Sequence, residues 1–325
     1  MRQETFWLDP LPPFRLDLTV WALRRRARNQ IDQWDGTTYT RVLLLDDQPV
    51  KVAVSQVSGR LLVTAASPAP LAHLRVRISH LLQQVLGYAT DVSAFTNLTA
   101  CDPTIADLAR RFQGLKPPRF PTLFEAFLNA FACQQVSLDV GLLLLNRLTE
   151  RYGLTWTDEQ GTSAAFPGPE QLVNVSEAQL RTLGWSRQKA RAALELASLL
   201  SQNPAHFARL EALSNEAICQ AILPLRGVGR WSAEYVLLRG LGRIDTFPGD
   251  DVGAQNNLKT LLSLDEKLTY ARINALTARW QPYAGFVYFH LLLRNLDKKG
   301  LLQVAGEPAD HLRPFPTVNH GPSFS

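Results

Sequence analysis

The sequence predicts an α+β protein, in which an N-terminal antiparallel sheet-and-helix domain precedes an all-helical core. Three observations support this class. Residues 38–64 alternate apolar or β-branched residues with polar ones, the chain after residue 103 turns to helical periodicity, and 325 residues exceed what one hydrophobic core usually organises. We expect three regions: an α+β domain over 1–100, a helical core of two lobes over 101–300, and a proline-rich, flexible tail over 301–325.

The N-terminal sheet is predicted from four short segments in which apolar and polar residues alternate. Asp46-Asp47-Gln48 and Ser58-Gly59 separate some of them and are typical of hairpin turns. From Leu71 to Leu86 apolar residues recur at helical spacing, which predicts a helix covering one face. The predicted strands are 14–18, 38–45, 50–54 and 60–64.

The helical region carries its own start and stop signals. Phe124, Phe127, Leu128 and Phe131 recur at helical spacing, which predicts a buried stripe. The series Ser176-Glu177-Ala178-Gln179 is a capping box. Gly184 and Ser186 then have the residue types of a helix end and of the next helix start, the latter helix carrying Lys189. Residues 152–169 are rich in glycine, threonine and proline, which predicts a loop.

Composition excludes several classes of protein. No apolar run approaches the roughly 20 residues that cross a bilayer, and the N-terminus lacks the features of a secretory signal. We therefore expect a protein of the cytoplasm or nucleoid, or of the nucleus in a eukaryote. Cys101, Cys133 and Cys219 are too scattered for a disulfide framework or a metal cluster, and we expect reduced, mostly buried thiols.

Charge says little about partners. The chain has 34 basic and 29 acidic residues, giving a net charge of +5. That excess suits a polyanionic partner but is common in proteins without one. The densest basic cluster, Arg24-Arg25-Arg26 with Arg28, is interpreted as a solvated face.

The segment from Leu223 to Asn257 carries the chemistry. A helix ends near Leu223, Gly227 and Gly229 form a tight turn, and a helix starts near Arg230. Such a hairpin presents backbone N–H groups that hold a phosphate without reading sequence, although many helical hairpins use glycine for geometry alone.

Two aspartates follow the second helix of this hairpin. In Phe247-Pro248-Gly249-Asp250-Asp251, proline and glycine shape a turn, and Asp251 stands where the next helix begins. Helix capping is the common role of such a residue. Two consecutive aspartates leave one for another task.

These residues resemble the helix-hairpin-helix (HhH-GPD) DNA glycosylases of base excision repair, and within them the DNA-3-methyladenine glycosylase II branch. The N-terminal strands are similar to that branch's extra domain, which resembles half of the TATA-binding protein, so the resemblance covers roughly residues 10–300. The matching segments are 227–235, 238–240, 247–251 and 279–282, with weaker similarity at 134–137 and 180–190.

The resemblance implies a role for each matching residue. Asp251 is the catalytic carboxylate, which stabilises an oxocarbenium-like sugar as the base leaves. Trp231 and Tyr235, four apart on one helix face, line the base pocket and favour a cationic base, although core packing explains such a pair equally well. The DNA-binding residues implied are Gly227, Gly229, Arg230, Ser232 and Gln135.

Several departures and absences refine these expectations. Gln135 stands where the branch has a leucine wedge, Arg226 where the hairpin usually has proline, and Leu292 where the pocket has an aromatic ring. Trp231 occupies the place of the nucleophilic lysine of bifunctional enzymes, so no strand cleavage is expected. No cofactor is required, while the resemblance implies a monovalent cation, Na⁺ or K⁺, on the carbonyls of Leu223, Leu225 and Val228.

The sequence thus predicts a monomeric, monofunctional N-glycosylase that removes alkylated bases of the 3-methyladenine and 7-methylguanine type from double-stranded DNA. Two alternatives stay open. One is a glycosylase for oxidised or deaminated bases, and the other a non-catalytic protein that uses the hairpin as a phosphate clamp.

Overall fold

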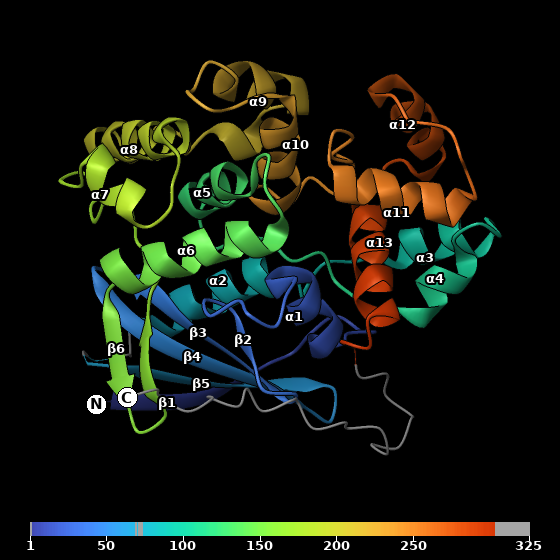
Figure 1. Cartoon of the computed structure of the whole chain (residues 1–325). Helices are drawn as coiled ribbons and strands as arrows, with labels where there is room; N and C mark the ends of the chain where they lie inside the picture. The colour runs from blue at the N-terminus through green and yellow to red at the C-terminus, as the bar shows by residue number, and fades with distance from the viewer. Residues whose placement is uncertain (1, 69, 71–73, 303–325) are drawn as a thin grey trace, which may run out of the picture.

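The computed structural model describes residues 2–68, 70 and 74–302, and Figure 1 shows a sheet at one end with helices stacked above it. The sheet is five-stranded and antiparallel, in the order β1-β5-β4-β3-β2. The hairpins predicted between residues 38 and 64 are confirmed, and two further strands flank them. The strands are β1 (Arg2–Leu8), β2 (Gln33–Trp34), β3 (Thr38–Leu45), β4 (Gln48–Val57) and β5 (Arg60–Ser67).

The strand predicted over 14–18 is wrong, because this segment begins helix α1 (Leu16–Arg24). The helix lies between two cores. Leu16 and Val20 pack with the sheet, whereas Leu18 and Trp21 pack with the C-terminal helices. A helix buried on both sides is apolar nearly all round, so its first residues show no helical periodicity to distinguish them from a strand.

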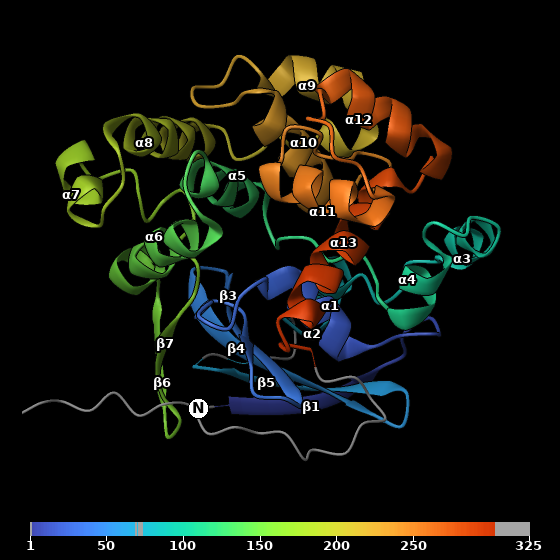
Figure 2. The same ribbon diagram turned by 45° about the vertical axis from the view of Figure 1, so that its right-hand side comes forward.

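The helix predicted to cover the sheet is confirmed as α2 (Leu74–Leu86), while residues 71–73 and the tail beyond 302 lie outside the described part. Figure 2 shows the later helices arranged above and beside the sheet. None of the helices in the described residues is long and apolar enough to span a membrane. The remaining helices are α3 (Ser93–Ala100), α4 (Ala106–Arg111), α5 (Leu123–Cys133), α6 (Leu138–Tyr152), α7 (Glu177–Thr182), α8 (Arg187–Gln202), α9 (Asn215–Ile222), α10 (Arg230–Arg239), α11 (Val252–Leu262), α12 (Tyr270–Thr277) and α13 (Ala284–Lys298), with short 3₁₀ turns at Leu210–Ala212 and Ala278–Trp280.

The loop predicted over 152–169 is wrong in part, because it contains a hairpin of β6 (Thr155–Asp158) and β7 (Gly161–Ala164). Long-range contacts stabilise this hairpin. Trp156 is buried against residues of β3, and Asp158 accepts a hydrogen bond from Lys51 of β4 at 2.6 Å. Contacts of this kind leave no local signal in a threonine-rich segment.

The predicted helix signals are confirmed. Ser176 and Gln179 form the reciprocal capping box of α7, and the Ser186 hydroxyl caps α8 by accepting from the Lys189 N–H. Gly184 follows α7 at a φ of +97°, where glycine is favoured. All four residues of the predicted stripe on α5 are buried.

The cysteines are free, but the prediction that most are buried is wrong. Cys101 is exposed, and Cys133 and Cys219 are half-buried. Cys101 directly follows α3 and Cys133 ends α5, whereas Cys219 lies within α9 on a side that is only partly covered.

A buried ion-pair cluster joins the sheet to α5. Arg41 of β3 donates to Asp32 at 2.7 Å and to Glu125 of α5 at 2.5 Å, and all three side chains are at most 3% exposed. Burial raises the pKa of Glu125, while the neighbouring Arg41 opposes that rise. The cluster ties the N-terminal sheet to the helical core. Water does not reach either carboxylate, so both depend on Arg41 to balance their charge.

We predict that Arg41→Leu lowers the free energy of unfolding by about 3–5 kcal/mol, because two buried carboxylates lose their cation. Urea unfolding followed by circular dichroism measures this. Arg60→Leu is the matched control, since the Arg60–Asp9 pair on the sheet is largely exposed and screened by water. Equal destabilisation by the two variants contradicts the prediction.

Candidate functional site

The glycine hairpin forms between α9 and α10 as predicted. Gly227 has a φ of +78°, and a Cβ there would lie 2.9 Å from the Cβ of Ala192 on α8. Glycine is therefore required both for the turn and for packing. At Gly229, which precedes the first residue of α10, nothing lies within 4 Å of the Cβ position. The N-terminus of α10 thus has free N–H groups beside open space, as an anion-binding hairpin requires.

The turn between α5 and α6 is tied to this hairpin by Gln134, a residue that sequence reasoning did not single out. Its side-chain amide donates to the Gly227 carbonyl and to the Ser232 hydroxyl, both at 2.7 Å. Ser232 is only 1% exposed, so its hydroxyl serves to hold Gln134 within the protein. The next residue, Gln135, is exposed at a φ of +52° and therefore projects from the turn beside the hairpin.

Asp251 caps a helix with one carboxylate oxygen and faces Trp231 with the other. As N-cap of α11, its Oδ1 accepts a hydrogen bond from the Ala254 N–H at 2.8 Å. Its Oδ2 accepts from the indole N–H of Trp231 at 3.3 Å. The cap fixes the orientation of the carboxylate, and the indole bond places its other oxygen at the aromatic pair.

Asp250 and Arg230 form a separate pair. Arg230 donates two hydrogen bonds to Asp250, at 2.7 and 3.0 Å, and its guanidinium lies 3.8 Å from the centroid of the Tyr270 ring. Of the two consecutive aspartates, Asp251 is thus the one that faces Trp231, while the charge of Asp250 is compensated.

Trp231 and Tyr235 lie together on α10, with ring centroids 5.3 Å apart and planes inclined by 31°. Trp231 is half-buried at the edge of the core, whereas Tyr235 is 2% exposed beneath it. Burial raises the pKa of Tyr235, so the phenol keeps its proton. Of the two rings, Trp231 offers the accessible surface, and Tyr235 supports it.

The prediction that the arginine cluster at 24–28 is a solvated face is wrong for two of its members. Arg25 is 4% exposed and donates to the Tyr235 hydroxyl at 2.7 Å and to the Asn129 side chain at 2.8 Å. Arg24 is 5% exposed, donates to backbone carbonyls and lies over the ring of Trp21. The partners of Arg25 lie far away in the sequence, so the local run of charge does not reveal them, whereas those of Arg24 lie within ten residues of it.

Arg239 of α10 is a second buried cation below the aromatic pair. It is 0% exposed and donates to the carbonyls of Ala22 and Leu23 in the last turn of α1, each at 3.0 Å. A helix C-terminus carries partial negative charge, which stabilises a cation there. Its guanidinium also lies 5.8 Å from the Tyr235 ring centroid. The inner side of Tyr235 therefore already faces a cation.

Glu234 of α10 holds the turn that leads to Asp251. Its carboxylate accepts a hydrogen bond from the Gly249 N–H at 3.1 Å and another from the Tyr270 hydroxyl. Burial raises the pKa of Glu234, and these two hydrogen bonds oppose the rise. Sequence reasoning missed Glu234, although it stands next to Tyr235 in the recognised segment.

Helix α13 closes the site from below, and α11 packs against it (Figure 1). Burial raises the pKa of Tyr288 on this helix well above its ordinary value, and the negative charge of Asp251 contributes to the rise. The Tyr288 ring packs edge-on against that of Phe247, with centroids 6.0 Å apart. Leu292, one turn further along α13, is half-buried in the core of the C-terminal helices.

The carbonyls implied as cation ligands lie at the hairpin. That of Leu225 accepts from the Val228 N–H at 3.1 Å, and a cation on Leu223, Leu225 and Val228 stays a prediction. Arg226, at the usual proline position, pairs with Glu195 of α8 at 2.7 Å.

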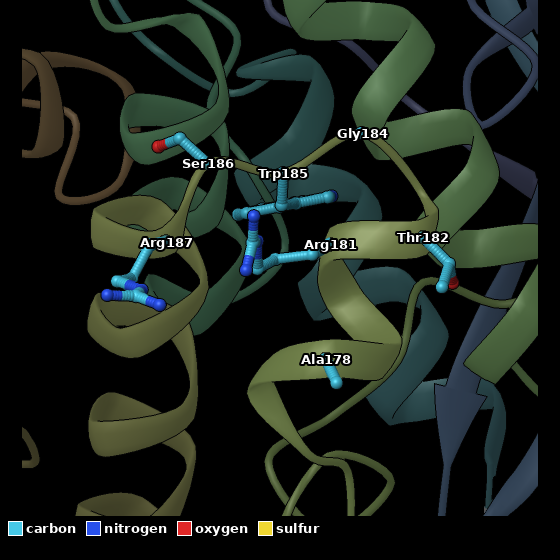
Figure 3. A pocket seen from close by; sticks show the side chains of 7 residues that line it. All are labelled: Ala178, Arg181, Thr182, Gly184, Trp185, Ser186 and Arg187. Carbon is cyan, nitrogen blue, oxygen red and sulfur yellow. The ribbon is translucent and has the colours of Figure 1, made fainter.

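A surface hollow of about 610 Å³ lies elsewhere, at the turn between α7 and α8. Figure 3 shows Arg181, Trp185 and Arg187 around it. Arg187 pairs with Glu177, and Trp185 is a core residue with its ring buried. The hollow is wide and shallow, and it holds no carboxylate placed like Asp251, so geometry favours the hairpin region as the site.

The comparisons with known proteins all point to DNA glycosylases and their superfamily. The family model of the HhH-GPD superfamily base excision DNA repair protein matches residues 128–282. The chain is 23% identical over 283 residues to a DNA-3-methyladenine glycosylase of Bacillus subtilis, covering 86% of this chain and 93% of that protein. It is 25% identical over 294 residues to DNA-3-methyladenine glycosylase 2 of Escherichia coli, covering 88% and 96%.

Solved structures share the fold. A 3-methyladenine DNA-glycosylase from Archaeoglobus fulgidus aligns with a TM-score of 0.79 at 22% identity, over 90% of this chain and 98% of that one. An 8-oxoguanine glycosylase/lyase of Clostridium acetobutylicum in complex with DNA aligns with a TM-score of 0.71 at 12% identity, over 88% and 93%. Residues 128–282, which carry the hairpin, Trp231 and Asp251, are thus the part of the chain that matches the helix-hairpin-helix (HhH-GPD) superfamily of base excision DNA repair proteins.

Proposed function

We propose that this protein is a monofunctional DNA N-glycosylase that removes alkylated bases from double-stranded DNA in base excision repair. The single observation that carries the proposal is the position of Asp251. One of its oxygens caps α11, and the other accepts from Trp231, whose ring is accessible. The 3-methyladenine glycosylases among the relatives support alkylated bases as the substrate.

The proposed reaction uses charge already fixed in the site. The hairpin N–H groups bind a phosphate of the duplex, and the target nucleotide rotates out of the stack. The flipped base stacks on Trp231. As the glycosidic bond breaks, positive charge grows on the sugar, and the carboxylate of Asp251 stabilises it and orients water for attack. An alkylated purine is cationic and leaves as a neutral base, so no general acid is needed.

The site proposed here needs no cofactor for chemistry. A Na⁺ or K⁺ ion on the hairpin carbonyls would support phosphate binding only. One flipped base occupies one pocket, so we propose that the protein acts as a monomer.

We predict that Asp251→Asn lowers base release from methylated duplex DNA by roughly 100-fold or more, because the stabilising charge is lost. Asparagine caps helices as well as aspartate does, so α11 keeps its cap and the fold stays intact. The measurement is release of 3-methyladenine and 7-methylguanine under single-turnover conditions.

Asp250→Asn is the matched control for this variant. It removes an equal charge one residue away, but that charge is paired with Arg230 and does not face Trp231. We expect base release within a few fold of wild type. If Asp250→Asn is the more damaging change, the carboxylate is misassigned.

We further predict that the enzyme releases bases without cutting the strand. Trp231 holds the place where bifunctional relatives are expected to have a lysine, so no imine to the sugar forms. Borohydride reduction during turnover traps such an imine as a covalent protein–DNA complex. Absence of trapped complex alongside an alkali-labile abasic product supports hydrolysis, and a trapped complex refutes it.

The base-release assay also separates the two alternative functions from the proposed one. A panel of duplexes containing methylated, oxidised and deaminated bases shows which are released. Release of oxidised or deaminated bases in preference to methylated ones favours the second class of glycosylase. Salt-dependent binding of every duplex with no base released from any of them favours a non-catalytic clamp.

A last prediction concerns Glu234, which positions the Asp251 turn without touching DNA. Glu234→Leu keeps a similar volume but removes both acceptor oxygens, so the hydrogen bonds from Gly249 and Tyr270 are both lost. We expect kcat to fall roughly three- to tenfold with KM nearly unchanged. Tyr270→Phe, which leaves the Gly249 bond intact, should have the smaller effect. A change confined to KM would contradict a positioning role.

A further inference from the structure

A second cavity lies apart from the Asp251 site, between α3, α4 and α13. Its volume is about 250 Å³. The walls are mainly apolar, with the rings of Phe95, Phe112 and Phe286 and the ring of His290 among them. Nothing in the proposed glycosylase mechanism uses this cavity, because the DNA-facing hairpin belongs to other helices.

His290 supplies the one strongly polar group buried in its wall. The residue is 2% exposed, and its Nδ1 lies 3.0 Å from the Phe286 carbonyl oxygen. A carbonyl only accepts, so Nδ1 carries the proton. Burial lowers the pKa of His290 to about 4, so the ring is neutral at pH 7. Nε2 is therefore a hydrogen-bond acceptor.

This acceptor has no partner among the described residues. Among the described residues, the His290 ring makes one hydrogen bond, through Nδ1. Nε2 is not one of the fully enclosed side-chain atoms without a partner, so part of its surface is accessible. The ring lines the cavity and the rest of the residue is buried, so we infer that the accessible surface of Nε2 faces the cavity. A donor bound in the cavity could therefore pair with this acceptor.

We propose that this cavity is a binding site for a small, neutral, planar heteroaromatic molecule whose N–H donates to Nε2 of His290. The three phenylalanine rings provide the contacts that aromatic ligands prefer, and Phe95 and Phe286 already lie 4.9 and 4.8 Å from the His290 ring.

The volume of the cavity and the charges around it limit which molecules can bind there. An apolar cavity of roughly 150 Å³ is known to hold benzene, and drug-sized ligands fill roughly 300 Å³ or more, so this cavity suits one or two fused rings. A charged molecule is disfavoured. Arg110, the arginine at the mouth, pairs with Asp107, and the interior offers no counter-charge among its described lining residues.

Indole and indene test the proposal as a matched pair, because they share a bicyclic shape and only indole has an N–H. Titration of each into the full-length protein, followed by calorimetry or ligand-detected NMR, gives the two dissociation constants. We expect indole to bind saturably and indene to bind roughly three- to tenfold more weakly. No saturable binding of indole overturns the proposal, and so does equal affinity for the two.

Two variants locate the binding. His290→Phe keeps an aromatic ring but removes the acceptor, so indole and indene should bind equally. Ala109→Leu fills the cavity from the half-buried face of α4 and should abolish binding of both. Undiminished indole binding by Ala109→Leu places the ligand elsewhere and refutes the site. This variant and the wild-type comparison decide the question even if His290→Phe does not fold.

The readout is binding alone, so it is independent of base release. A protein without glycosylase activity that prefers indole over indene refutes the proposed function but not this site. A protein that releases bases but binds neither molecule refutes this site but not the proposed function.

Discussion

Arg25 donates to the Tyr235 hydroxyl and to Asn129 in a part of the core that excludes water. Both Nη atoms of this buried guanidinium donate to protein partners, so Arg25 constrains the position of α1 relative to α10 and α5. Arg239 adds a second such link from α10 to the end of α1. The aromatic pair of the candidate site therefore packs above two buried cations, Arg25 and Arg239. Their hydrogen-bond partners lie in α1, α5 and α10.

Contacts within and next to helices also hold the Asp251 carboxylate in place. Asp251 is oriented by the first turn of the helix that it caps, and the turn before it is held by Glu234 through Gly249. Both Glu234 and Trp231 belong to α10, which begins at the glycine hairpin. One ten-residue helix thus fixes the N-terminus at the glycine hairpin, the accessible ring and the approach to the carboxylate. A displacement of α10 would disturb all three together.

Local patterns were sufficient for much of the fold. The three long strands of the sheet, the capping box at Ser176 and the buried stripe of α5 follow from periodicity and from residue types at helix ends. The two secondary-structure predictions that failed share one cause. Helix α1 and the hairpin at Trp156 owe their structure to contacts with distant segments, which a local window does not contain. The division into domains at residue 100 stays a prediction, although residues from both sides share the same cores.

The sequence by itself determined the hairpin, the two aspartates and the aromatic pair, because glycine, proline and capping residues act over a few positions. Only the tertiary structure decided which aspartate faces Trp231, since that depends on Arg230 neutralising Asp250. It also decided that Arg25 is buried beneath Tyr235 rather than solvated. Whether a charged side chain is paired or hydrated depends on groups brought near it by folding, and neighbours in sequence do not specify them.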